Sequence, residues 1–205
     1  MWRGVVEHYF SRRPVSRPEL GLVRCHLHGH YFEFVTATGV FSHKKIDNGT
    51  RLLVESMILP EGGALLDVGC GYGPVGIAAA RLRPSLDVWM TDINHRAVSL
   101  AKENVRRNGT HNAHVLEGPL YEPVGGRTFD AIVTNPPLSA GVAKVVDPFV
   151  AGSVGHLRHG GSLQVVVRTT KGGSSVAGLL ERHFGGFEVV ARGSGYRVLM
   201  AVKKG

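Results

Sequence analysis

Two short segments of this 205-residue chain hold residues whose types and spacing could do chemistry. Residues 67–76 read DVGCGYGPVG, and residues 135–138 read NPPL. Glycines allow tight turns with positive φ and let a ligand approach the backbone closely. Two successive prolines remove two backbone donors and leave carbonyl groups as unopposed acceptors. We therefore expect a ligand-binding turn in the first segment and a site for a hydrogen-bond donor in the second.

The glycine segment follows a predicted strand at residues 64–68 and leads into a predicted helix at residues 74–82. Its residues 71–76 fit the G-x-G-x-x-G template of dinucleotide sites. Asp92 ends the next predicted strand, where a carboxylate can accept hydrogen bonds from both ribose hydroxyls of a nucleoside. A dinucleotide and S-adenosylmethionine both satisfy this pattern.

Asp67 separates the two ligands, because it lies two residues before the first glycine. A carboxylate beside the turn would repel a pyrophosphate, whereas it suits the ammonium group of an amino acid. S-adenosylmethionine carries such an ammonium group and has no phosphate. The sequence therefore favours S-adenosylmethionine as the cofactor.

The NPPL segment directly follows a predicted strand at residues 129–134, so it should face the same crevice as the glycine turn. The Asn135 amide oxygen and the Pro136 carbonyl can accept both hydrogens of a planar exocyclic amine. The nitrogen lone pair then turns toward a sulfonium methyl group. No strong base is needed, and positioning alone can supply about 7–11 kcal/mol. Asn135, Pro136 and Pro137 are the expected catalytic residues.

Strand-like and helical stretches alternate after residue 60. The expected strands are residues 64–68, 86–91, 115–116, 129–134, 163–167, 187–191 and 196–202, and the expected helices are residues 74–82, 94–107, 142–157 and 176–183. This order predicts an α/β, Rossmann-like fold with a mostly parallel seven-stranded sheet. The last two strands are too close for a helical crossover, so the C-terminal strand should be antiparallel.

The first 60 residues follow another pattern. Five arginines (Arg3, Arg12, Arg13, Arg17 and Arg24) fall in the first 24 positions. Two β-like runs at residues 22–28 and 31–37 predict a hairpin. A helix is expected from Asn48 to Ile58. We expect residues 1–60 to be an N-terminal extension with a hairpin and a lid helix, and residues 61–205 to be the adenosylmethionine-binding domain.

The composition limits the class of protein. Hydrophobic residues make up 43% and charged residues 20%, as in globular proteins. The net charge of +8 points to a polyanionic partner such as nucleic acid or a membrane surface. Only Cys25 and Cys70 are present, so neither a disulfide framework nor a zinc site is expected. Without a long apolar run or an apolar signal core, a soluble, cytoplasmic protein is expected.

Several segments together resemble one family. Residues 67–76, 91–94 and 135–138 resemble class I S-adenosylmethionine-dependent methyltransferases that act on planar nitrogens. Residues 39–50, 120–124 and 195–199 resemble the small-subunit ribosomal RNA guanine-N2 methyltransferase family in its short, single-domain form. The resemblance extends from about residue 8 to residue 202.

The resemblance implies methylation of the exocyclic amine of a guanine in RNA, with 16S ribosomal RNA as the expected substrate. It implies that Asp67, Gly69 and Gly71 hold the methionine part of the cofactor and that Asp92 holds its ribose. The full cofactor-binding set is Asp47, Thr50, Asp67, Gly69, Cys70, Gly71, Gly73, Asp92, Ile93, Asn94, Glu117, Gly118 and Pro119. Phe41, Lys44 and Leu138 are the expected substrate-binding residues, and no metal is expected.

Two positions depart from the family pattern. Pro119 stands where relatives place an acid, so backbone groups or Glu117 would have to bind the adenine amine. Leu138 stands where an aromatic residue often stacks on the target base, a contact worth about 1–3 kcal/mol per base. Phe41, Tyr72 or His43 would have to supply that surface instead.

The target base must be single-stranded, looped or flipped out to reach a methyl donor. The arginine-rich N-terminal arm and the Lys44–Lys45 pair could hold the RNA backbone. Three alternatives remain open from the residues alone. They are a protein-glutamine methyltransferase acting on a ribosomal or release-factor protein, a non-catalytic RNA-binding module, and a nucleotide-linked dehydrogenase.

Overall fold

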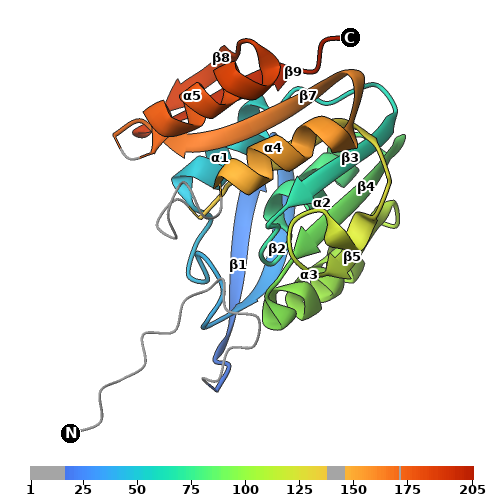
Figure 1. Cartoon of the computed structure of the whole chain (residues 1–205). Helices are drawn as coiled ribbons and strands as arrows, with labels where there is room; N and C mark the ends of the chain where they lie inside the picture. The colour runs from blue at the N-terminus through green and yellow to red at the C-terminus, as the bar shows by residue number, and fades with distance from the viewer. Residues whose placement is uncertain (1–16, 138–145, 171) are drawn as a thin grey trace, which may run out of the picture.

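A seven-stranded sheet forms the centre of the computed structural model, which describes residues 17–137, 146–170 and 172–205 (Figure 1). Its strand order is β5-β4-β3-β6-β7-β9-β8. The strands are β3 (Gly63–Val68), β4 (Leu86–Asp92), β5 (Ala113–Glu117), β6 (Phe129–Thr134), β7 (Leu157–Arg168), β8 (Glu188–Gly193) and β9 (Tyr196–Val202). Strands β3 to β7 pair in parallel, whereas β9 lies antiparallel between β7 and β8. The predicted mostly parallel sheet with an antiparallel C-terminal strand is confirmed.

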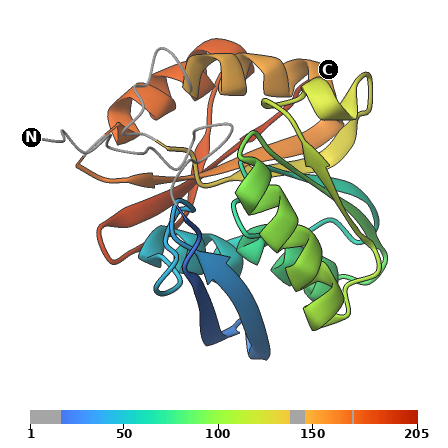
Figure 2. The ribbon, with the colours of Figure 1, turned by 90° about the horizontal axis from the view of Figure 1, so that it is seen from below.

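Helices cover both faces of the sheet (Figure 2). One face carries α1 (Asn48–Ser56), α2 (Pro74–Leu82) and α3 (His95–Asn108), and the other carries α4 (Asp147–His156) and α5 (Gly173–Phe184), with the short 3-10 helix η1 (Glu122–Val124) beside β5. Each face has its own buried cluster, with Leu65 and Val133 among the residues of the first and Leu66 and Ile132 among those of the second. The predicted alternation of strands and helices therefore produces two cores, one on each side of the sheet.

Two predicted boundaries differ from the structure around β7. The helix expected at residues 142–157 ends at His156, because Leu157 already begins β7, and its residues 142–145 lie outside the described residues. The strand expected at residues 163–167 instead spans Leu157–Arg168. Gly160 has φ +77° within it, and the pairing register with β6 shifts between Phe129 and Ala131. Gly160 and Gly161 thus accompany an irregularity inside a continuing strand.

The predicted hairpin is confirmed as β1 (Leu20–Leu27) paired antiparallel with β2 (His30–Ala37). Its turn residues His28 and Gly29 both have positive φ, +47° and +77°, as a two-residue turn of the twisted hairpin type requires. The hairpin lies on the face of the sheet that carries α1, α2 and α3 (Figures 1 and 2).

Two asparagines of α3 bind the free backbone edge of β2. Asn104 accepts a hydrogen bond from the Val35 N–H at 2.7 Å and donates to the Val35 carbonyl at 2.9 Å. Asn108, one helical turn later, bonds the Glu33 N–H at 3.3 Å and its carbonyl at 2.8 Å. A primary amide carries one acceptor and one donor group, so each asparagine replaces one residue of a neighbouring strand. These four bonds fix the position of the segment that follows the hairpin.

Among the described residues, no helix combines the length and the apolar character that a membrane crossing requires. Within the same ranges, no group of three or more His, Cys, Asp or Glu side chains is arranged to hold a metal ion. The hairpin and α1 share a buried cluster with α2 and α3. The division of the chain at residue 60 remains a prediction.

Candidate active site

A cavity of about 410 Å³ opens at the carboxyl ends of β3, β4 and β6. The glycine turn forms one side of it, and Thr134 to Pro137 form another. The segment after the hairpin contributes Val40, Phe41 and Ser42. Hydrogen bonds from α3 hold this segment, because the Asn94 side chain donates to the Gly39 carbonyl at 3.0 Å and Arg96 donates to the Thr38 carbonyl at 2.6 Å. The two motifs singled out in the sequence therefore meet in one cavity.

The glycine turn exposes backbone to this cavity. Gly69 and Gly71 have φ of +73° and +58°, which L side chains rarely adopt. A Cβ atom at either position would meet no protein atom within 4 Å, so the space in front of both residues belongs to the cavity. Gly76 differs, because a Cβ there would overlap the Met90 side chain. The first two glycines make room for a ligand, and Gly76 lets α2 approach β4.

Two carboxylates, the buried Asp67 and the half-buried Asp92, anchor the turn. Asp67 is 1% exposed and accepts a hydrogen bond from the Gly76 N–H at 2.9 Å. The pKa of Asp67 is raised to about 7, chiefly by burial; the hydrogen bond from the Gly76 N–H opposes this shift, and the nearby Asp92 adds to it. Asp92 accepts from the Gly71 N–H and the Asn94 N–H, both at 2.8 Å. Burial also raises the pKa of Asp92, although its backbone hydrogen bonds oppose the shift. A cation that enters the cavity would therefore find a carboxylate whose ionisation it can favour.

Asn135 is held in one orientation by two oxygen atoms. Its Nδ2 donates to Asp47 Oδ2 and to Thr50 Oγ1, both at 3.0 Å. Asp47 also caps the N-terminus of α1, because its Oδ2 accepts from the Thr50 N–H at 3.1 Å. Since both hydrogens of the Asn135 amide have acceptors, its Oδ1 is the atom left for a ligand. The site therefore offers an acceptor at this position.

Tyr196 of β9 supports this arrangement from the far end of the chain. Its hydroxyl donates to Asp47 Oδ1 at 3.2 Å. Burial and the Asp47 carboxylate raise the pKa of Tyr196, so the hydroxyl keeps the proton that it donates. The ring packs against α1 so closely that a Cβ at Gly49 would overlap it. Tyr196, Asp47 and Asn135 thus form one chain of hydrogen bonds, which we call the Asn135 network.

The cavity brings together most of the site residues expected from the sequence. They are Phe41, Thr50, Asp67, Gly69, Cys70, Gly71, Asp92, Ile93, Pro119, Asn135, Pro136 and Pro137. Phe41 is 37% exposed, so it lies at the mouth. Burial raises the pKa of the Cys70 thiol, which disfavours the thiolate. Leu138 lies outside the described residues, and the roles of all these residues remain proposals.

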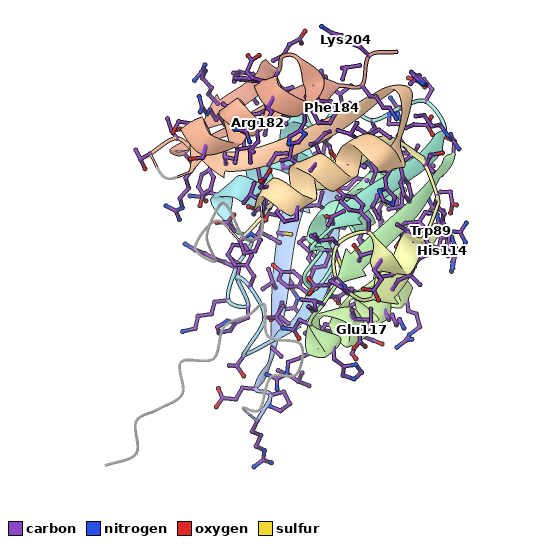
Figure 3. All side chains as sticks on the ribbon, viewed as in Figure 1. Trp89, His114, Glu117, Arg182, Phe184 and Lys204 are labelled. Carbon is purple, nitrogen blue, oxygen red and sulfur yellow. The ribbon has the colours of Figure 1, made fainter. Side chains whose placement is uncertain are left out.

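Six expected residues do not line the cavity. They are Lys44, Asp47, Gly73, Asn94, Glu117 and Gly118. Asp47 acts through Asn135, and Asn94 caps α3 by accepting from the Arg96 and Ala97 N–H groups. Glu117 lies at the end of β5 (Figure 3). Its Oε2 is 2.7 Å from Nδ1 of His95 on α3. Gly118 has its would-be Cβ position filled by Pro123. Lys44 is exposed.

Sequence reasoning gave no role to several residues that the structure places at the site. Tyr196, Leu120 and Phe149 are the main ones, and the last two line the cavity. Leu120 has φ +46°, and its carbonyl accepts from the Thr91 hydroxyl at 2.9 Å. The sequence held one signal for Tyr196, since it lies in the family-like segment 195–199. Leu120 had the same kind of signal, since it begins the family-like segment 120–124, whereas nothing in the local pattern distinguished Phe149 from an ordinary core residue.

Known proteins share this fold and these segments. A family model described as "Methyltransferase small domain" matches residues 31–200. The Bacillus subtilis "Uncharacterized protein YbxB" is 38% identical over 96% of this chain and 98% of its own length. The Vibrio cholerae "Ribosomal RNA small subunit methyltransferase C" is 32% identical over 85% of this chain and 51% of its own. The chain thus spans about half the length of the ribosomal RNA methyltransferases that it matches.

Solved structures of methyltransferases are also similar to this chain. The Thermus thermophilus 16S rRNA N2 G1207 methyltransferase (RsmC), in complex with AdoMet and guanosine, superposes with a TM-score of 0.81. It is 27% identical, over 93% of this chain and 52% of its own. A ribosomal protein L11 methylase from Lactobacillus delbrueckii has a TM-score of 0.60 at 24% identity, which is a likeness of fold alone. The expected class I methyltransferase fold is confirmed, and the chain belongs to the methyltransferase small domain family.

Proposed function

We propose that this chain is an S-adenosylmethionine-dependent methyltransferase that acts on the exocyclic N2 amine of a guanine in ribosomal RNA of the small subunit. One observation carries the proposal. The Asn135 amide has both of its hydrogens bound to Asp47 and Thr50, so it presents only an acceptor oxygen to the cavity that the glycine turn lines. This arrangement selects a substrate group that donates hydrogen bonds.

The cavity fits the cofactor. S-adenosylmethionine, when bound, supplies an electrophilic methyl group on a sulfonium centre. Gly69 and Gly71 leave open space where side chains would project, and the buried Asp67 carboxylate suits an ammonium group. Asp92 would hold the ribose hydroxyls with the lone pairs that the Gly71 and Asn94 N–H groups leave free. Pro119 and Leu120 line the side where an adenine ring would lie.

The NPP residues orient the accepting nitrogen. Neither Pro136 nor Pro137 has a backbone N–H, so no donor competes with the Asn135 oxygen and the Pro136 carbonyl for the substrate amine. An exocyclic amine with both hydrogens bound in this way keeps its lone pair directed away from them. Catalysis is then positioning of the nitrogen, and the proton can leave after the methyl group has been transferred.

Two observations support RNA as the substrate class, and a third argues against a non-catalytic binding module. Relatives over most of this chain are named for small-subunit ribosomal RNA methylation, and the similar Thermus structure contains guanosine. The net charge of +8 suits a polyanion. Asn135, Asp47 and Asp67 are all engaged in ordered hydrogen bonds, as a working site requires. Because ribosomal RNA lies in the cytoplasm, we propose that this protein is located in the cytoplasm.

Methyl transfer from labelled S-adenosylmethionine tests the proposal. Purified protein is incubated separately with small-subunit ribosomal RNA and with ribosomal and release-factor proteins, which offer the planar amide of glutamine. We expect label in the RNA only. Label in the protein fraction would support the glutamine alternative, and absence of transfer with intact cofactor binding would support a binding module. Binding of NAD in preference to S-adenosylmethionine would overturn the proposal altogether.

A further inference from the structure

Three arginines lie at the ends of the last strands of the sheet. Arg168 is the final residue of β7, Arg192 is the next-to-last residue of β8, and Arg197 is the second residue of β9. Because β9 runs antiparallel between β7 and β8, its start lies at the same edge as their ends. This is the edge at which β6 ends in Thr134 and the cavity opens. We call Arg168, Arg192 and Arg197 the arginine edge.

Carboxylates do not neutralise this edge. Within residues 17–137, 146–170 and 172–205, none lies within 4.0 Å of a side-chain nitrogen of the three arginines. Two arginines at the opposite edge of the sheet have carboxylate partners. There Arg83 lies 3.5 Å from Glu61, and Arg158 lies 2.6 Å from Asp130. The three arginines beside the cavity therefore differ from Arg83 and Arg158, which are each paired with a carboxylate.

Two of these arginines face each other across neighbouring strands, which lowers the stability of the fold. Arg192 lies directly opposite Arg197 in the β8–β9 register, and like charges in such pairs are destabilising. The Arg197 Nε is also buried without a hydrogen-bond partner among the described residues. A bound anion would relieve both penalties, because a guanidinium group binds phosphate through parallel N–H donors.

The third arginine connects the edge to the Asn135 network. The Arg168 guanidinium lies over the Tyr196 ring, 4.9 Å from its centroid. The hydroxyl of the same ring donates to Asp47, which accepts from Asn135. Asp47 is the acid of this network, and its oxygens already bind Tyr196, Thr50 and Asn135. Glu188 lies at the other end of β8. Arg168 thus lies beside Tyr196, which reaches Asn135 through Asp47.

The arginine-rich N-terminal arm is the surface that the sequence led us to expect for RNA. Of its arginines, Arg3, Arg12 and Arg13 lie outside the described residues. Arg24 is paired with Glu33 at 2.8 Å. Such pairing reduces the net charge that the hairpin offers to a phosphate. Arg17, Lys44 and Lys45 are exposed, so they add positive charge to that offered by the arginine edge.

We propose that the arginine edge binds the phosphates of single-stranded RNA next to the target guanine. The inference rests on the proposed function, and it names the surface that presents the substrate to Asn135. Each phosphate contact made on single-stranded RNA contributes about 0.7 to the slope of log affinity against log salt concentration. The edge also fixes the direction from which the strand approaches, since Arg168 lies beside Tyr196.

Two double variants with the same change of charge test the proposal. Arg168→Gln with Arg192→Gln removes two exposed arginines from the proposed edge, and Arg83→Gln with Arg158→Gln removes two exposed arginines from the opposite edge. Binding of a single-stranded RNA oligonucleotide and of small-subunit ribosomal RNA is titrated at several salt concentrations. Methyl transfer to the ribosomal RNA gives KM and kcat, and calorimetry gives the affinity for S-adenosylmethionine.

We expect the first double variant to lose about 1.4 from the salt slope and to raise the RNA KM about tenfold, with cofactor affinity unchanged. The second should match wild type within about twofold. Suppose that wild type methylates RNA. If both double variants then keep the wild-type salt slope and RNA KM, or if both change these two quantities equally, the arginine edge is wrong and the proposed function stands. If wild type transfers no methyl group to RNA, the proposed function fails, and equal slopes in the binding titration would then overturn the edge as well.

Discussion

The two sides of the cavity are built in different ways. The part of the cofactor side that would face the ammonium group and the ribose comes from one continuous stretch, in which Asp67 and Asp92 bind backbone N–H groups of the turn between them and of the helix starts. The catalytic side comes from three distant segments, because Asn135 is 88 residues from Asp47, which is 149 residues from Tyr196. Local backbone geometry makes the first side, whereas the second side exists only once the sheet is complete. Variants should therefore separate binding from catalysis.

We expect Asn135→Ala to separate catalysis from cofactor binding most strongly. The variant loses the acceptor that orients the amine, so kcat should fall roughly 10²–10³-fold, as for removal of other oriented catalytic groups. Its affinity for S-adenosylmethionine should stay within about twofold of wild type, because the cofactor side is unchanged. Steady-state transfer to ribosomal RNA and calorimetry give the two numbers. Equal losses in both would contradict the division of the cavity.

Asp67→Asn should have the converse effect. Loss of a buried carboxylate opposite an ammonium group should weaken cofactor binding by roughly 30-fold or more at pH 8, about 2 kcal/mol. Because the pKa of Asp67 is raised to about 7 in the free protein, wild-type binding must expel a proton below that pH. Wild-type affinity should therefore rise with pH up to about 7 and then level off, while the variant stays flat. Calorimetry over this range would contradict the assignment if the wild type showed no pH dependence.

The same carboxyl group makes a prediction about stability. A raised pKa in the folded state means that the protonated form is favoured by folding, so this contribution is complete at low pH and is lost as the pH rises. Ligand-free wild type should lose stability relative to Asp67→Asn between about pH 4 and pH 7. Denaturant titrations across this range measure the difference. Parallel stability curves for the two proteins would show that Asp67 is not buried as described.

Gly71→Ala has a matched control in Gly109→Ala. Both glycines have similar positive φ, +58° and +65°, and neither would place a Cβ within 4 Å of another atom. Each substitution should therefore lower stability by about 1–2 kcal/mol. Only the first adds a methyl group to the cavity, so it alone should weaken cofactor binding, by about tenfold. Equal cofactor affinities for the two variants would mean that the turn does not contact the ligand.

The smallest predicted effect belongs to Tyr196→Phe. The variant keeps the ring but loses the hydrogen bond to Asp47, which is worth about 1 kcal/mol, so kcat should fall about fivefold. Cofactor affinity should not change, and the substitution should have no further effect in the Asn135→Ala background. Tyr31→Phe is the control, since that hydroxyl bonds Glu33 on the hairpin. An additive loss in the double variant would mean that Tyr196 does not act through Asn135.

The difference between the cofactor side and the catalytic side of the cavity also explains which site residues could be predicted from the sequence. The turn from Asp67 to Pro74 could be identified because glycine, proline and acid preferences are local. Asn135 could be identified because two prolines follow it directly. Tyr196 could not be assigned, because its partner Asp47 becomes a neighbour only when β9 inserts between β7 and β8. Asp47 was expected to bind the cofactor or close its pocket, which remains a prediction, whereas its observed contacts are with Asn135, Thr50 and Tyr196.

The central claim is that the catalytic side presents an acceptor to an exocyclic amine. Its most direct test is to label small-subunit ribosomal RNA from cells that lack the gene with methyl-labelled S-adenosylmethionine and the purified protein. The RNA is then digested, and its nucleosides are separated by mass. All label should appear in N2-methylguanosine. Label on a ribose oxygen or a ring nitrogen would contradict the account.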